Sequence, residues 1–149
     1  MYKLQVDKKT FSCSIGAPFS ANGMYAPVAR GVLKRTKKYN EWIEKNQPLL
    51  EEALLPAKEF PISLKVVVMG GRGFNSMTKN DIDNLKKPLC DLLVRAKIVP
   101  DDEKKYISRV EISYLPSPTS GCEPLTFISY EEPEPEIIEW TAPYFWEKE

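Results

Sequence analysis

Acidic and basic side chains are concentrated in one short part of the sequence, residues 81–103. These side chains are Asp81, Asp83, Lys87, Asp101, Asp102 and Glu103. Carboxylate oxygens are the hard ligands that Mg²⁺ or Mn²⁺ prefers. Such an ion can activate water and stabilise a phosphoryl group under attack, and a nearby lysine can neutralise phosphate charge. The pattern therefore indicates a carboxylate metal site suited to cutting a phosphodiester.

Each part of this pattern also has a purely structural interpretation. A pair of aspartates at a helix start commonly caps the helix and interacts with its dipole. Asp83 and Lys87, four residues apart, can form a surface ion pair, and the Asp-Asp pair after Pro100 is typical of a turn. From the residues alone both interpretations stay open.

The residue types that are missing narrow the chemistry. The sequence has no histidine, and its three cysteines, Cys13, Cys90 and Cys122, are widely spaced. A zinc site with nitrogen and sulphur ligands is nearly excluded, and so are histidine-dependent catalytic triads. Any acid–base or metal chemistry must use carboxylates, lysines, tyrosines or hydroxyls.

A helix is predicted over about Ile82 to Lys97 because its apolar residues form one stripe. The stripe consists of Ile82, Leu85, Leu89, Leu92, Leu93 and Ala96. On a regular helix Asp81 would lie roughly 160° around the axis from Asp83, at about 100° per residue. Both can share one ion only if Asp81 belongs to the segment before the helix. Pro88, inside the helix, is expected to kink it.

The remaining patterns predict one small α/β (α+β) domain, with a mixed sheet and two main helices in the order β-α-β-α-β-β. Strands are expected at Thr10–Gly16, Phe60–Met69, Lys105–Tyr114 and Leu125–Tyr130, and a helix at Leu33–Asn46 that Pro48 interrupts. Residues 17–31 and 70–80 are expected to be loops. The domain is expected to span residues 1–130, followed by an acidic, aromatic tail at 131–149.

The net charge of zero conceals an uneven distribution. The tail holds seven glutamates and one lysine, a net charge of −6, so residues 1–130 carry +6. Five cations lie within nine residues: Arg30, Lys34, Arg35, Lys37 and Lys38. Such a cluster is compatible with a phosphate-bearing partner, although a solvated helix face is the commoner meaning.

Two features suggest the compartment. The sequence has no apolar run long enough for a membrane span. Its N-terminus is too charged for the apolar part of a secretory signal. We therefore expect a cytoplasmic protein without a membrane partner.

The ordered pattern Asp81-Ile-Asp83-Asn-Leu-Lys-Lys87, an apolar helix and then Pro100-Asp-Asp102 resembles the RusA family of Holliday-junction resolvases. The spacing from the first aspartate to the last is the family's spacing. The segment 18–25 and the strand before the motif are also similar to the family. The resemblance covers roughly residues 10–130 and is sharpest over 81–103.

This resemblance implies a RusA-like fold and a homodimeric, Mg²⁺-dependent endonuclease that resolves four-way DNA junctions in recombination and repair. It implies Asp81, Asp83 and Asp102 as catalytic metal ligands and Lys87 as the catalytic lysine. Such proteins are commonly encoded by phages and prophages, so a bacterial or phage-infected cell is the expected setting.

Contacts to the DNA backbone are expected from cations outside the catalytic set. These are Arg72, Lys79, Lys86 and the cluster Arg30, Lys34, Arg35, Lys37 and Lys38. The family has several arginines just before the first aspartate, where this chain offers only Lys79, with Arg72 farther back. The tail lies beyond the family core, and it could screen the basic surface or recruit a protein partner.

Helix length raises a question about how the site is completed. From Asp83 to Lys97 a helix rises about 21 Å, and the five residues to Asp102 span at most roughly 17 Å. Either the helix ends early, or Asp102 meets Asp81 and Asp83 of a neighbouring subunit, and we expect the second.

Two alternatives to an enzyme stay open: a non-catalytic junction-binding protein on the same fold, and a phage accessory or interaction protein that acts through the tail.

Overall fold

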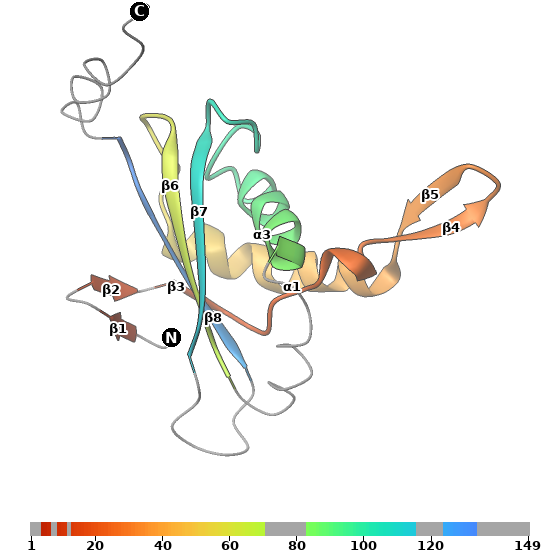
Figure 1. Cartoon of the computed structure of the whole chain (residues 1–149), viewed down its shortest axis with the longest axis horizontal. Coiled ribbons are helices and arrows are strands. Elements are labelled where there is room, and N and C mark those ends of the chain that lie inside the picture. Colours follow the sequence, from red (N-terminus) through yellow and green to blue (C-terminus); the bar gives the residue numbers. More distant parts are fainter. Residues whose placement is uncertain (1–3, 7–8, 12, 71–82, 116–123, 134–149) are drawn as a thin grey trace, which may run out of the picture.

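A four-stranded mixed sheet organises the molecule, and two helices cover one of its faces (Figure 1). The computed structural model describes residues 4–6, 9–11, 13–70, 83–115 and 124–133. The sheet order is β3 (Cys13–Ile15), β8 (Leu125–Glu131), β6 (Ile62–Met69) and β7 (Ile107–Leu115). Strand β6 runs parallel to β7 and antiparallel to β8. The helices are α1 (Lys37–Ala53) and α3 (Asp83–Arg95). The expected fold class and the order of these six elements are confirmed.

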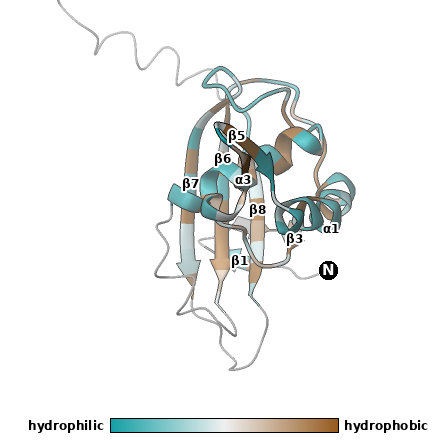
Figure 2. Cartoon of the chain, turned by 90° about the vertical axis from the view of Figure 1, so that its right-hand side faces the viewer, coloured by the Kyte–Doolittle hydropathy of each residue, from teal (hydrophilic) through white to brown (hydrophobic). Residues whose placement is uncertain are grey.

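Alternation along the strands separates the two faces of the sheet. On β6, Ile62, Leu64, Val66 and Val68 are buried in the main core with the helices. Val67 faces the other way and packs with Phe11 and Phe127 in a smaller cluster. The hairpin of β1 (Leu4–Val6) and β2 (Lys9–Phe11) contributes Phe11 and Leu4 to that second cluster. Brown, apolar segments along β6 and β8 can be followed in Figure 2. No helix in the described ranges combines the length and apolar character that crossing a membrane requires.

The first predicted strand, Thr10–Gly16, is divided in the structure. Phe11 belongs to β2, and Cys13 and Ile15 belong to β3, which pairs with β8. Phe11 lies in the smaller cluster, whereas Cys13 and Ile15 lie in the main core. The prediction of one strand over Thr10–Gly16 was wrong, because two strands lie there and pack against different layers.

Residues 25–35 form a β-hairpin instead of the predicted loop and helix start. Strand β4 (Tyr25–Ala29) pairs with β5 (Val32–Arg35), and Gly31 turns the chain at a φ of 75°. This hairpin, which we call the arm, projects from the body beside the start of α1 (Figure 1). Five residues predicted as loop and three predicted as helix are therefore in strands. Val32 and Leu33 fit a strand because β-branched and apolar residues favour extended backbone.

Helix α1 starts later than predicted and passes through Pro48. Thr36 caps it by accepting a hydrogen bond from the Tyr39 amide, so the helix begins only at Lys37. Pro48 deprives the Glu44 carbonyl of its helical donor. Both residues are exposed, so water can hydrate that carbonyl, and buried Ile43, Asn46 and Leu50 hold the helix on either side of the proline. The predicted interruption at Pro48 was wrong for this reason.

Helix α3 ends two residues earlier than predicted. The Ile98 amide donates to the Leu93 carbonyl and the Lys97 amide to the Val94 carbonyl, both at 3.0 Å. Lys97 has a φ of 60°, the left-handed conformation of a Schellman cap. The chain then reverses toward the helix. Ile98 is buried after the cap, and its carbonyl accepts a hydrogen bond from the Ala57 amide at 2.9 Å. This reversal decides where Asp102 lies.

Candidate active site

Helix α3 presents an apolar stripe to the core and its charged residues to the opposite side. Leu85, Leu89, Leu92, Leu93 and Ala96 are all buried, as predicted, whereas Ile82 lies outside the described residues. Asp83, Lys86 and Lys87 are exposed. The burial of the stripe fixes the rotation of α3, so Lys87 is directed away from the core.

Lys87 and Asp102 are in contact within one chain. The Lys87 ammonium donates to Asp102 Oδ2 at 2.7 Å. The Lys87 side chain is 53% exposed and the Asp102 side chain 29%. The pair is therefore held together while Lys87 remains open to a ligand. Of the three acidic residues after Pro100, Asp102 is the one that the family spacing singles out, and it is the one that lies against the lysine.

This contact removes the geometric reason for completing the site across a dimer. The expectation assumed a helix reaching Lys97, but α3 ends at Arg95 and the cap at Lys97 reverses the chain. Asp102 thereby returns to Lys87, one helical turn from Asp83, without help from a second subunit. The helix does end early, as the first of the two options requires.

Lys87 has a second acidic partner, Asp91, which the sequence interpretation missed. The Lys87 ammonium lies 3.3 Å from Asp91 Oδ1. The Tyr39 hydroxyl, from α1, donates to Asp91 Oδ2 at 2.9 Å. Lys87 and Asp91 are four residues apart on a helix, a spacing that could have indicated the pair. No local pattern indicates Tyr39, which is 52 residues away from Asp91.

The possible surface pair of Asp83 and Lys87 is absent from the ion pairs of the described ranges. Lys87 pairs with Asp91 and Asp102 instead. Asp83 is the first residue of α3 and is exposed, where its charge suits the positive end of the helix dipole. The surface ion pair that the structural interpretation offered for Asp83 is thus not formed.

Proton affinities follow from these contacts. The hydrogen bond from Lys87 is the main cause that holds the pKa of Asp102 below its ordinary value. The hydrogen bond to Asp102, followed by the charge of Asp91, raises the pKa of Lys87 well above its ordinary value despite partial burial. Lys87 is therefore a fixed cation near neutral pH and not a proton acceptor. Burial raises the pKa of the nearby Cys90 thiol to about 11, so this cysteine is not a thiolate nucleophile.

The carboxylates suit a hard divalent cation by their chemistry. Asp83 and Asp102 offer oxygen donors of the kind that Mg²⁺ prefers. Over the ranges that the structure describes, no three acidic, cysteine or histidine side chains gather closely enough to hold a metal ion. Asp81, the third ligand implied by the resemblance, lies outside the described residues. By donor type the two described carboxylates suit such an ion, and Asp81 would complete the set.

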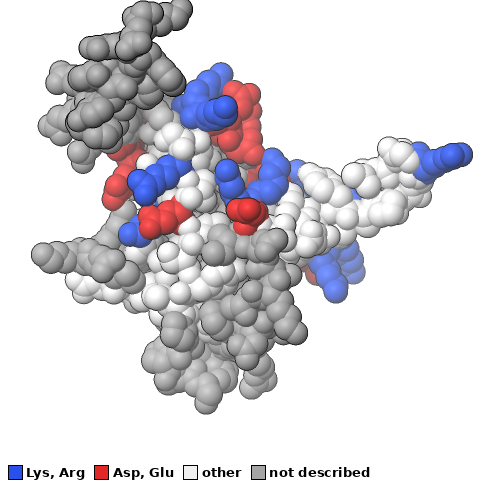
Figure 3. Space-filling model, viewed as in Figure 1, with Lys and Arg blue, Asp and Glu red and all other residues white. Residues whose placement is uncertain are grey.

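The basic cluster has a definite place in the fold. Arg30 lies in the turn of the arm, Lys34 and Arg35 on β5, and Lys37 and Lys38 on the first turn of α1. The sequence contains no acidic residue between Asp7 and Glu41. The outer part of the arm accordingly shows only blue and white in Figure 3. Arg72 and Lys79, two further expected DNA contacts, lie outside the described residues.

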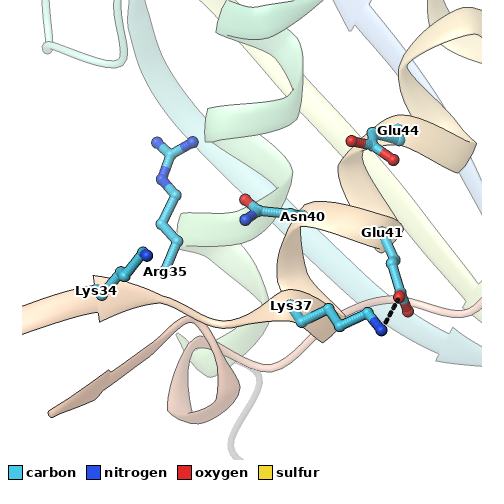
Figure 4. A pocket seen from close by; sticks show the side chains of 6 residues that line it. All are labelled: Lys34, Arg35, Lys37, Asn40, Glu41 and Glu44. Carbon is cyan, nitrogen blue, oxygen red and sulfur yellow. Dashed lines mark ion pairs between the residues drawn. The ribbon is translucent and has the colours of Figure 1, made fainter. Parts of the chain in front are cut away.

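An open hollow of about 520 Å³ lies where the arm meets α1. Lys34, Arg35, Lys37, Asn40, Glu41 and Glu44 line it (Figure 4). The Lys37 ammonium forms an ion pair with Glu41 Oε1 at 3.8 Å. The Arg35 guanidinium lies 5.7 Å from the centre of the Tyr39 ring. The cluster is thus divided between the arm and the start of a helix, and it does not form a single helix face.

Comparisons with known proteins add no family to this geometry. The chain matches no protein-family model, and a search of curated proteins gives no match. The functional interpretation therefore depends on the motif and on the contacts around Lys87.

Proposed function

We propose that the chain is a metal-dependent, structure-specific endodeoxyribonuclease that resolves four-way DNA junctions. The observation that carries this proposal is the contact between Lys87 and Asp102 within one chain. Two residues that the motif assigned to one site, fifteen positions apart in the sequence, meet in the fold. The proposal places the protein in the cytoplasm of a bacterial or phage-infected cell, where such DNA occurs, as a homodimer with two sites.

Asp81, Asp83 and Asp102 would hold the ion, Mg²⁺ or Mn²⁺. When bound, such an ion lowers the pKa of a water molecule and stabilises charge on the phosphate under attack. Lys87 supplies a permanent positive charge beside Asp102, because its pKa lies well above neutrality. That charge would bind a non-bridging oxygen of the scissile phosphate and orient it.

The arm and the start of α1 would bind the DNA backbone. Arg30, Lys34, Lys37 and Lys38 are exposed, and the arm extends Arg30 and Lys34 away from the body. Phosphate contacts of this kind supply affinity and position without reading sequence. Lys86, which is exposed on α3 beside Lys87, would contact the strand that enters the site.

Replacing Asp83 by Asn tests the proposal. Asp83 is exposed and takes part in no ion pair within the described ranges, so the variant should fold normally. We expect it to lose cleavage of a synthetic four-way junction in Mg²⁺ while it still binds the junction in Ca²⁺ or EDTA. Glu103→Gln, a nearby change outside the proposed ligand set, is the matched control and should cleave normally.

The same assay separates the two alternatives. A non-catalytic junction-binding protein would bind the junction but show no cleavage in the wild-type chain. An interaction protein that uses its tail would not bind the junction at all. Either result, obtained with folded wild-type protein and Mg²⁺, would reject the nuclease proposal.

A further inference from the structure

Lys87 is held by an acidic residue whose own position is fixed from a different helix. Asp91 Oδ1 lies 3.3 Å from the Lys87 ammonium, and Asp91 Oδ2 accepts a hydrogen bond from the Tyr39 hydroxyl at 2.9 Å. The Asp91 side chain is only 17% exposed, compared with 53% for Lys87. Both oxygens of this carboxylate are thus used, one for each partner.

This arrangement differs from an ordinary pair on a helix surface. A lysine that precedes an acidic residue by four positions has the less favourable orientation, and exposed pairs contribute little. Lys37 and Glu41 form such a pair on α1, at 3.8 Å with side chains 91% and 60% exposed. Asp91 is instead mostly buried and bonded to a buried tyrosine, so its rotamer is held independently of Lys87.

Tyr39 is itself fixed by several neighbours. Its amide donates to the Thr36 side chain in the cap of α1, and its ring is fully buried. The rings of Phe19 and Trp42 lie 5.3 and 6.2 Å from it, centre to centre. A hydroxyl on so constrained a ring can point in few directions, and here it points to Asp91.

We propose that Asp91 is a positioning residue for Lys87, and that Tyr39 positions Asp91. Asp91 and Asp102 together direct the ammonium to one place, where either partner alone would let the exposed side chain swing. The consequence for cleavage rests on the proposed nuclease function, in which the Lys87 charge must meet a phosphate oxygen. Small displacements of a positioned group can cost about 100-fold in rate.

Two variants test the inference: Asp91→Asn and Tyr39→Phe. We expect Asp91→Asn to lower kcat for junction cleavage by about 10- to 100-fold, with little change in KM or in junction affinity. Tyr39→Phe should change kcat in the same direction by less, and Asp91→Glu should recover part of the loss.

Tyr130→Phe is the matched control, because the Tyr130 hydroxyl donates to the Leu55 carbonyl at 2.6 Å on another part of the molecule. Glu41→Gln is the control for loss of a pair with this spacing.

A second measurement does not depend on catalysis. Relaxation of the Lys87 side-chain ¹⁵N nucleus reports how tightly the ammonium is held. We expect it to be ordered in the wild-type protein, clearly more mobile in Asp91→Asn and Tyr39→Phe, and unchanged in both controls. If the wild-type chain does not cut DNA, the nuclease proposal fails while this measurement still decides the positioning role.

Defined outcomes would overturn the inference. One is an unchanged mobility of Lys87 in the folded Asp91→Asn protein. Another is a rise in KM with unaltered kcat, which would mean that Asp91 acts in binding. If Asp91→Asn does not fold, as judged by circular dichroism, Tyr39→Phe decides on the same two criteria, because it removes one oxygen atom and keeps the ring packing.

Discussion

Of the two acidic partners of Lys87, the one fifteen residues away makes the shorter contact. The Lys87 ammonium lies 2.7 Å from Asp102 Oδ2 and 3.3 Å from Oδ1 of Asp91, which is on the same helix. Hydrogen bonds between charged groups are stronger than neutral ones, but solvent weakens them where the groups are exposed. Asp102 therefore contributes modestly to stability, in addition to its proposed role in the site.

Replacing Asp102 by Asn should reveal that contribution through its pH dependence. We expect the free energy of unfolding to fall by about 1 kcal/mol at pH 7. The pKa of Asp102 is depressed in the folded state. Its stabilisation is therefore complete above the unfolded pKa of about 3.9 and is lost as pH falls through the folded value. Urea unfolding at about pH 7 and at successively lower pH should show the wild-type and variant stabilities converging. A difference that stays constant with pH would contradict this account.

Sequence patterns predicted the residues of the proposed site better than their contacts. The motif pointed to Lys87 and Asp102, which do meet. It could not indicate Tyr39, because a contact across 52 residues depends on how α1 packs on α3. The structural alternative paired Lys87 with Asp83, because spacing alone does not distinguish the residue one turn before from the residue one turn after.

At the level of elements, the α3 cap determines the path of the chain to the site. Lys97 has the left-handed conformation that glycine usually occupies at this position. A side chain in that conformation costs roughly 1 kcal/mol. The helix end was hard to predict for this reason, since no glycine marks it.

Replacing Lys97 by Gly should stabilise the protein. We expect the free energy of unfolding to rise by about 0.5–1 kcal/mol, because the backbone strain is relieved. Lys97→Ala, which removes the side chain but keeps the strain, is the control and should remain close to the wild type. Thermal unfolding of the three proteins measures the effect. Equal stability of the glycine and alanine variants would argue against the strained cap.

Neutralising cations on the arm should weaken DNA binding without affecting the chemistry. For Arg30→Gln combined with Lys34→Gln we expect weaker binding on every sequence. The dependence of log affinity on log salt should become shallower by about one for each phosphate that the variant no longer neutralises. Lys58→Gln, an exposed lysine beyond the other end of α1, is the control. An unchanged salt dependence would remove the arm from the DNA-binding surface.

The central strand of the sheet was predicted well, and the exposed hairpin of the arm was predicted poorly. Ile62–Met69 lies in the centre of the sheet, and its run of β-branched residues was sufficient. Residues 25–35 contain Pro27 and Gly31, which favoured a loop, and the hairpin pairs only with itself. Pro48 similarly suggested a helix break, although burial on both sides of it holds α1 together.

At the scale of the whole molecule, the site contact within one chain makes a prediction about mixed dimers. If each site belongs to one subunit, a dimer of one Asp83→Asn and one Asp102→Asn subunit contains no intact site. We therefore expect that mixing the two inactive variants, with subunit exchange, restores no junction cleavage. A mixture of wild type and Asp83→Asn is the control, because its mixed dimers keep one intact site and should nick the junction. Recovery of activity in the first mixture would show that the subunits share their sites.

The contacts around Lys87 also differ in how far apart their partners lie along the chain. Asp102 and Asp91 are fifteen and four residues from Lys87, so α3 and the turn after it are enough to bring these three together. Tyr39 lies 52 residues before Asp91, so the contact between them closes a much longer loop. Since short loops close at lower entropic cost, we expect the lysine and its two carboxylates to meet early in folding. Their final orientation would then come with the docking of α1, one of the later and more global steps.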